Sequence, residues 1–263
     1  MSIDARDISV RIGRKVIVSG VTLTAVAGQV TAIVGPNGSG KTTLLRAISG
    51  DLGHEGMLSL NGRPIAGMRP WEAAGMRAVL PQSTALAFPF TVREVVALGL
   101  TAGHAGVDRG ELDLLPDMAL ERVDLSGFSG RFYQELSGGE QQRVQLARVL
   151  CQVWQPVLDG QPRWLLLDEP VSSLDIRHQI IIMDIARDFA LGGGGVVAVL
   201  HDLNLTAMYA DRIAAMNKGR LAACGTPAEV LTDELISTVF ECPLGVGRVP
   251  PPGVPFVLPQ SAF

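Results

Sequence analysis

The sequence predicts an α/β protein with a parallel-sheet core, an antiparallel β subdomain beside it and an inserted helical subdomain. Three short apolar runs support the core, because continuous β-branched runs are typical of strands buried on both faces: Val30–Val34 and residues 164–167 and 196–200. Each run is followed at once by polar residues. Because the carboxyl ends of parallel strands meet at one edge of a sheet, we expect these polar residues to converge on one site.

The other segments have different patterns. Short alternating stretches in the first 30 residues and in residues 57–65, with a hairpin signal at Asn61-Gly62, predict the β subdomain. Helical spacing dominates residues 91–150, and the chain is proline-rich after Cys242, which predicts an extended surface tail. We therefore expect a single domain, residues 1–263, divided into a core with its β subdomain (1–82 and 151–242), a helical subdomain (83–150) and a tail (243–263).

Composition narrows the function classes. The 263 residues are 47% hydrophobic and 18% charged, which argues against disorder. A net charge of −4 argues against a general nucleic-acid binder, which usually carries a basic face. Three widely separated cysteines argue against a disulfide framework or a zinc site. The sequence has no signal-peptide core and no apolar run of about 18 residues, so we expect a cytoplasmic protein; if it works at a membrane, it does so through a partner.

A phosphate-binding loop follows the first buried strand. Residues 35–42, GPNGSGKT, fit the pattern G-x-x-x-x-G-K-[ST] between a strand and a helix. Glycines let backbone N–H groups turn toward a phosphate, and the helix N-terminus adds positive potential. We expect Lys41 to reach the terminal phosphates of a bound nucleotide and the Thr42 hydroxyl to bind Mg²⁺. The rest of the expected nucleotide cradle is Gly35, Pro36, Asn37, Gly38, Ser39, Gly40 and Thr43.

Two carboxylates follow the second buried strand, in the sequence LLLDEP. We expect Asp168 to hold Mg²⁺ through water, as in other phosphate-loop nucleotidases. Glu169 points elsewhere and can take a proton from an attacking water. Adjacent carboxylates alone more often cap a helix, but the upstream phosphate loop favours the catalytic interpretation.

A second anion site is indicated by LSGGEQQRV, residues 136–144. Ser137, Gly138 and Gly139 open a helix whose N-terminal amides can bind phosphate. A chain with a complete phosphate loop does not need this site for its own nucleotide. The sequence therefore resembles the ABC-type ATPases, in which this signature closes over the nucleotide of the opposite protomer. The resemblance covers Ile8 to about Gly225 and includes six motifs in order.

The resemblance implies a phosphate-loop, RecA-like core and roles for further residues. Glu169 resembles the general base, and His201 resembles the switch histidine that contacts the γ-phosphate. Gln82 resembles the glutamine that ligates Mg²⁺ and senses the partner at the junction with the helical subdomain. Asp175 resembles the residue that bridges two protomers. The other histidines, which are expected to be surface or structural residues, are His54, His104 and His178.

Two positions call for separate expectations. The family usually has an aromatic residue to stack on adenine where this chain has Ile12, so ATP is expected to be held less tightly. In residues 83–91, Leu86 and Phe88 either form an exposed patch for a membrane subunit or pack as a hinge on the helical subdomain. Both interpretations stay open at this point.

The resemblance also implies an assembly. A single ATPase unit fits a homodimer of ATPase subunits that works with polytopic permease subunits and a periplasmic substrate-binding protein, at the cytoplasmic face of the bacterial inner membrane. The GEQQRV and HDLN stretches resemble importers of iron chelates, haem and cobalamin. The long link at residues 151–164 and the ending GTPAEVLTDELI resemble the ATP-binding subunits of hemin importers. The alternatives are a siderophore or cobalamin importer, or a soluble ABC ATPase such as one for Fe–S cluster assembly.

Overall fold

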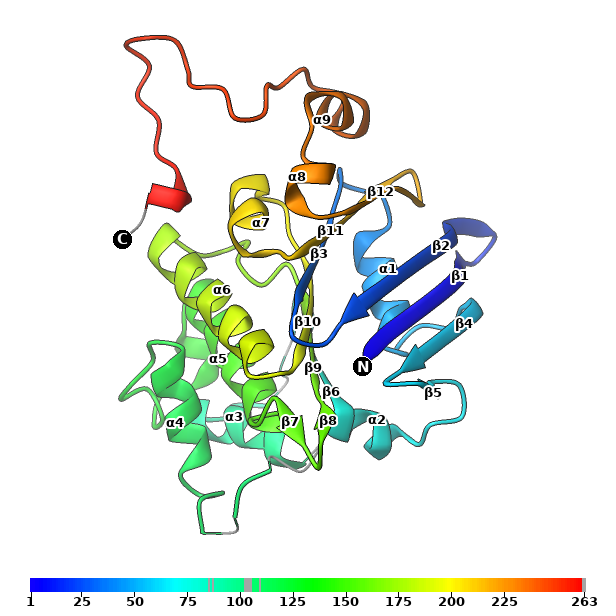
Figure 1. Cartoon of the computed structure of the whole chain (residues 1–263). Coiled ribbons are helices and arrows are strands. Elements are labelled where there is room, and N and C mark those ends of the chain that lie inside the picture. Colours follow the sequence, from blue (N-terminus) through cyan, green and yellow to red (C-terminus); the bar gives the residue numbers. More distant parts are fainter. Residues whose placement is uncertain (85, 87, 102–105, 109, 262–263) are drawn as a thin grey trace.

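The fold was examined in a computed structural model of the chain, in which a twisted parallel sheet separates two layers (Figure 1). One face of this sheet is covered by the helical half of the chain, and the other by α1 (Lys41–Ile48) and the antiparallel sheet. This is the α/β arrangement that the sequence predicts. The structure describes residues 1–84, 86, 88–101, 106–108 and 110–261.

The core sheet has its three predicted buried strands side by side at its centre. The order is β12 (Arg220–Gly225), β11 (Arg212–Asn217), β3 (Val30–Val34), β10 (Gly195–Val199), β9 (Trp164–Asp168) and β6 (Arg77–Leu80). Neighbouring strands are parallel except for β12, which is antiparallel to β11. Every residue of β3, β9 and β10 is buried, which explains their unbroken apolar character.

The antiparallel sheet has the order β2 (Lys15–Val26), β1 (Ser2–Ile12), β4 (Glu55–Leu60) and β5 (Arg63–Pro64). Asn61 and Gly62, with φ of 51° and 76°, form the predicted hairpin turn between β4 and β5. The Asn61 side chain also accepts the indole N–H of Trp164 at 3.1 Å. This hydrogen bond joins the β subdomain to the start of strand β9.

The helices of residues 83–150 pack on the face of the core sheet opposite α1, together with α6 (Ile176–Leu191) and α7 (Leu203–Tyr209). One of them, α5 (Gly138–Gln152), buries Val144, Ala147 and Leu150. The other helices of the described chain are α2 (Pro70–Met76), α3 (Val92–Thr101), α4 (Leu115–Arg122), α8 (Pro227–Val230) and α9 (Asp233–Phe240), with short 3-10 helices η1 (Tyr133–Glu135) and η2 (Pro259–Ser261).

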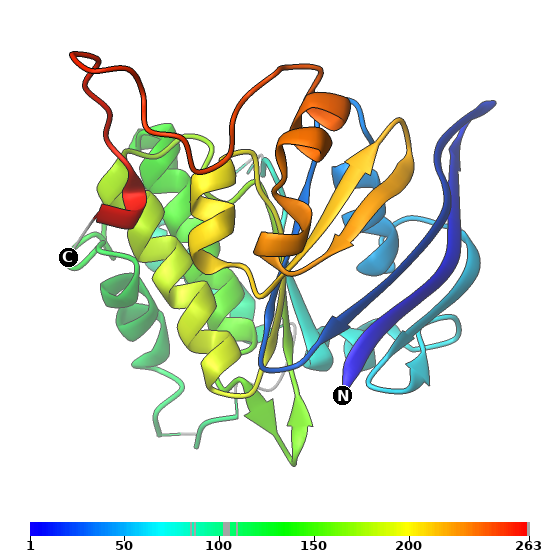
Figure 2. The ribbon, with the colours of Figure 1, turned by 45° about the horizontal axis from the view of Figure 1, so that its top comes forward.

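The link before β9 and the C-terminal tail both lie at the periphery of the fold. The long link at residues 151–164 forms a hairpin of β7 (Val157–Leu158) and β8 (Gln161–Pro162). The proline-rich tail leaves α9 and returns to the molecule beside α7, where η2 packs (Figure 2). Its end is fixed by Gln260, whose amide donates to the carbonyl of Asn204 at 3.0 Å. Most of the described tail residues are exposed, as the composition predicts.

Two further expectations can be compared with the structure. Within the described ranges, no helix is both long enough and apolar enough to cross a membrane. The three cysteines are free, as their number and spacing predict.

Candidate active site

The phosphate loop joins β3 to α1 through a backbone that only glycine can follow at its ends. Gly35 has a φ of 146°, and a Cβ atom there would collide with the carbonyl oxygen of Met216. Gly40 has a φ of 99° and immediately precedes α1. These two glycines therefore give the loop the shape that the motif predicts. Pro36 and Ser39 lie within the loop, and Thr43 lies in the first turn of α1.

Lys41 places a buried cation inside this loop. Its side chain is folded back, so that Nζ donates to the carbonyls of Gly35 at 2.9 Å and Pro36 at 3.1 Å. Burial lowers the pKa of Lys41, while the carboxylates of Glu169 and Asp168 act in the opposite direction. The ammonium group thus lies within reach of the loop and near both acidic groups.

Thr42 and Asp168 bring together two oxygen ligands. The Thr42 hydroxyl donates to Oδ1 of Asp168 at 3.0 Å, across the ends of α1 and β9. Burial raises the pKa of Asp168, and the hydrogen bond from Thr42 opposes that rise. Hydroxyl and carboxylate oxygens are the ligands that Mg²⁺ prefers. The residues present therefore fit a magnesium ion at this position.

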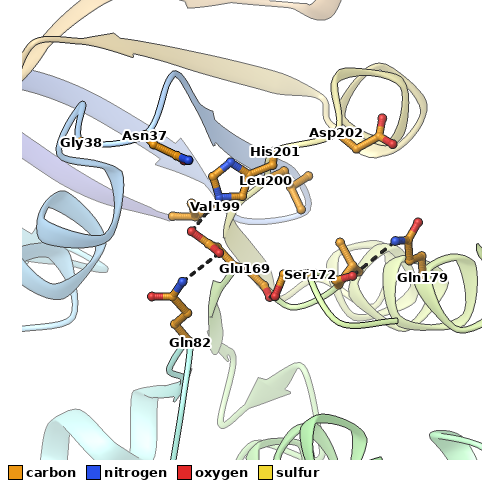
Figure 3. A pocket seen from close by; sticks show the side chains of 11 residues that line it. Asn37, Gly38, Gln82, Glu169, Ser172, Gln179, Val199, Leu200, His201 and Asp202 are labelled. Carbon is orange, nitrogen blue, oxygen red and sulfur yellow. Dashed lines mark hydrogen bonds and ion pairs between the residues drawn. The ribbon is translucent and has the colours of Figure 1, made fainter. Parts of the chain in front are cut away.

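Glu169, His201 and Gln82 meet at one edge of the core sheet (Figure 3). Nε2 of His201 lies 2.6 Å from Oε1 of Glu169, and Nε2 of Gln82 donates to Oε2 of Glu169 at 2.9 Å. Glu169 follows the carboxyl end of β9, His201 that of β10 and Gln82 that of β6, and β10, β9 and β6 are consecutive strands in the sheet. The predicted convergence of polar residues at the strand ends is therefore observed.

The Glu169 backbone has a φ of 51°, a left-handed conformation that residues other than glycine seldom adopt. Its N–H donates to the carbonyl of Val199 at 3.2 Å. Its carbonyl accepts hydrogen bonds from the Gln142 amide at 2.9 Å and the Ser172 hydroxyl at 3.2 Å. These bonds hold the turn that points the carboxylate toward His201 and Gln82.

Gln142 is a site residue that sequence reasoning missed. It lies in the second turn of α5, directly after the signature, and connects that helix to the turn carrying Glu169. The run of glutamines in LSGGEQQRV was the available signal, because an unpaired amide on a buried helix needs a hydrogen-bond partner.

The cluster faces a pocket of about 650 Å³. The phosphate loop contributes Asn37 and Gly38 to the lining of this pocket, which Glu169 and His201 also line (Figure 3). Asp202 also lies at this pocket, but its carboxylate caps α7 by accepting the N–H groups of Asn204 and Leu205. The other lining residues are Gln82, Val171, Ser172, Gln179, Val199 and Leu200.

The signature residues lie outside this pocket, on the surface. Ser137 caps α5, and its hydroxyl and backbone N–H each donate to Oε2 of Glu140 at 2.7 Å. Ser137 and Gly138 are exposed and Gly139 is half-buried. The structure therefore leaves this predicted anion site apart from the nucleotide cradle of the same chain.

Asp175 is also separate from the pocket. It caps the N-terminus of α6, where its Oδ1 accepts the backbone N–H of His178 at 2.9 Å. This bond from the His178 N–H is the main reason why the pKa of Asp175 lies below its usual value. Its side chain is 67% exposed, so the carboxylate faces solvent as well as the helix.

Three more predicted positions are on or near the surface. Ile12 is exposed at the end of β1, with no aromatic residue in its place. Leu86 is partly buried against the main core, whereas Phe88 is 69% exposed. The hinge interpretation thus fits Leu86 and the exposed-patch interpretation fits Phe88. Two positions in this segment, 85 and 87, and His104 lie outside the described residues.

Comparisons with known proteins identify the family of this chain. The model of the family described as ABC transporter matches residues 18–172. The hemin import ATP-binding protein HmuV of Mesorhizobium japonicum is 67% identical over 260 residues, covering 99% of both chains. The protein of the same name from Rhizobium meliloti is 61% identical over 261 residues, also covering 99% of both chains.

Solved structures have the same fold. The ATP binding subunit of an ABC transporter gives a TM-score of 0.76 at 23% identity, covering 88% of this chain and 92% of that chain. The ADP conformation of MJ1267, an ATP-binding cassette of an ABC transporter, gives 0.74 at 23% identity, covering 92% and 99%. At this identity the likeness concerns the fold.

Proposed function

Because this chain belongs to the ABC transporter family, we propose that it is the ATP-hydrolysing subunit that powers hemin import through a separate membrane permease. The observation that carries the hydrolytic part is the Gln82–Glu169–His201 cluster beside the phosphate loop. The hemin cargo is supported by full-length identity of 67% with a hemin import ATP-binding protein.

The phosphate loop and Lys41 bind the nucleotide. Backbone N–H groups between Gly35 and Lys41 surround the phosphates, and Lys41 exchanges the loop carbonyls for the terminal phosphates. Thr42 and Asp168 would hold Mg²⁺, with Gln82 as a further ligand from the helical side. When bound, Mg²⁺ neutralises phosphate charge and lowers the barrier to transfer.

Proton transfer falls to Glu169. One of its carboxylate oxygens accepts the proton of the attacking water, which general-base catalysis requires to be within hydrogen-bond reach. Gln82 and His201 each hold one oxygen of this carboxylate, so its orientation is set before the water arrives. The His201 ring also faces the pocket, where it contacts the γ-phosphate.

The assembly is a head-to-tail homodimer. Ser137, Gly138 and Gly139 lie away from the nucleotide cradle of their own chain, so we assign them to the phosphate held by the second copy. The exposed carboxylate of Asp175 bridges the two copies. The helical subdomain, residues 83–150, contacts polytopic permease subunits at the cytoplasmic face of the inner membrane, and a periplasmic binding protein delivers the cargo.

The test of hydrolysis is Glu169→Gln, which keeps the shape of the side chain and removes the base. ATP binding should be retained, and turnover should fall about 10²- to 10⁴-fold. Lys41→Ala should instead weaken nucleotide binding itself. Retention of more than half the wild-type rate by Glu169→Gln would show that another group is the base.

The test of assembly uses the same variant. With ATP and Mg²⁺, Glu169→Gln should become dimeric in light scattering, and adding Ser137→Arg should abolish the dimer while one chain still binds ATP. If the dimer still forms in the variant carrying Ser137→Arg, the two copies associate through a different interface.

The test of cargo uses proteoliposomes containing the permease and its binding protein. ATP-dependent uptake of hemin, without uptake of a ferric siderophore or cobalamin, is the expected result. Uptake of either competitor in place of hemin overturns the cargo assignment. A pull-down from membranes that returns only soluble partners overturns the transport role itself.

A further inference from the structure

His178 lies in the first turn of α6 between two carboxylates that come from different parts of the chain. Its Nδ1 is 2.8 Å from Oδ1 of Asp175, and its Nε2 is 3.4 Å from Oδ2 of Asp124. The side chain is 17% exposed. Because both ring nitrogens face a carboxylate oxygen, both can donate only when the imidazole is doubly protonated.

Asp124 belongs to the helical subdomain, just after α4. Its backbone has a φ of 58°, and its carbonyl accepts a hydrogen bond from Arg143 of α5 at 2.7 Å. These features fix the residue within the helical subdomain while its carboxylate extends to α6. There it meets His178 and also Arg177, whose Nη2 lies 3.0 Å from Oδ2.

Asp175 contacts the ring nitrogen of His178 that faces away from Asp124. Its Oδ1 accepts the backbone N–H of His178 and also lies 2.8 Å from Nδ1 of the ring, so the carboxylate and the imidazole form one unit at the start of α6. Arg177 touches Asp124, but no contact joins it to Asp175 among the described hydrogen bonds and ion pairs. His178 therefore connects the two carboxylates, whereas Arg177 ties α6 to Asp124 alone.

We propose that His178 is a positioning residue that clasps the helical subdomain to Asp175, so that movement of this subdomain moves the carboxylate used between protomers. The proposal rests on the proposed function, in which Asp175 acts across the homodimer. In this arrangement a shift of Asp124 displaces the His178 ring, and the ring in turn displaces Asp175 in the segment that follows Glu169. The clasp lies outside the nucleotide pocket and leaves nucleotide binding to the phosphate loop.

The clasp predicts a specific kinetic signature. The His178–Asp124 contact is a single long one at 3.4 Å, and the Asp124 side chain is 43% exposed, so losing this contact should cost little folding free energy and leave the fold intact. In the reconstituted transporter, His178→Ala should lower kcat for ATP about 5- to 10-fold and leave KM within about 2-fold, since a residue that couples two sites modulates the coupling without contacting the ligand. Transport should fall in parallel.

Matched variants separate the clasp from general damage. Asp124→Asn should reproduce the loss in kcat, and the double variant His178→Ala/Asp124→Asn should be no worse than either single variant. Arg177→Ala removes the neighbouring ion pair and keeps both contacts of His178, so it should retain wild-type turnover. His178→Arg supplies a cation that can reach both carboxylates and should restore much of the lost rate.

The outcomes distinguish this proposal from the function on which it rests. A wild-type protein that does not hydrolyse ATP overturns both. An active wild-type protein with unchanged kcat in His178→Ala overturns only the clasp. Losses that add in the double variant, or that accompany a lowered Tm with no rescue by His178→Arg, show that His178 is merely structural and overturn the clasp as well.

Discussion

His201 and Glu169 lie at the ends of neighbouring strands, with 2.6 Å between Nε2 of the ring and Oε1 of the carboxylate. The opposite oxygen of Glu169 accepts the amide of Gln82 at 2.9 Å. The carboxylate is thus held at both oxygens by residues from two different strand ends. The orientation of the carboxylate therefore depends on how the ends of β10 and β6 are placed beside β9.

His201→Ala should therefore lower turnover more than ATP binding. The substitution removes one of the two groups that hold Glu169, and the same ring lines the pocket where we propose that the γ-phosphate binds. We expect kcat to fall about 10²-fold, the usual contribution of a positioned catalytic group. Steady-state ATPase assays and equilibrium nucleotide binding provide the two measurements. A tenfold weaker ATP affinity with normal kcat would place His201 in binding alone.

Ile12→Tyr should lower the KM for ATP more than it changes kcat. A ring at this exposed position can stack on adenine, and stacking of a base on an aromatic side chain is worth about 1–3 kcal/mol. Ile12→Leu is the control, since it is similar in size and has no ring. If the tyrosine variant binds ATP with wild-type affinity, the base lies elsewhere.

Phe88→Asp should leave basal ATPase and stability nearly unchanged and abolish co-purification with the permease. Phe88 is 69% exposed and lies in the segment that follows Gln82. Leu191→Asp is a matched control, because Leu191 is 70% exposed at the far end of α6. Normal permease binding by Phe88→Asp would move the contact to another surface.

Leu86→Asp should behave differently from Phe88→Asp. Leu86 packs against the main core, so the aspartate buries a charge and destabilises the protein by about 1–3 kcal/mol. Thermal unfolding followed by circular dichroism gives the comparison. An unchanged Tm would mean that Leu86 is free to leave the core and join the Phe88 surface.

Thiol labelling should count two of the three cysteines in the folded protein. Cys224 and Cys242 are exposed, whereas burial raises the pKa of Cys151 to about 12. At pH 8 the Cys151 thiol is protonated and inaccessible, and the thiolate is the reactive form. Ellman's reagent should therefore detect the third thiol only after unfolding. Cys151→Ala should leave the native count unchanged and lower the unfolded count by one.

The sequence predicts the core well because its signals are local. Unbroken apolar runs mark β3, β9 and β10, and the residues that follow them meet because parallel strands end together. The contact of Gln142 with the Glu169 carbonyl could not be predicted in this way, since it depends on how α5 packs against the sheet. The sequence predicts His178 only as a surface or structural residue; its contact with Asp124 joins residues far apart along the chain, which no local pattern indicates.

The φ of 51° at Glu169 sets folding against catalysis at a single residue. A left-handed backbone costs a residue with a side chain about 1–2 kcal/mol, a cost that glycine escapes. Glu169→Gly would relieve this backbone cost, but it would also remove the contacts of the carboxylate with Gln82 and His201. The left-handed turn is therefore a local cost of folding that this chain carries at the position proposed for its catalytic base.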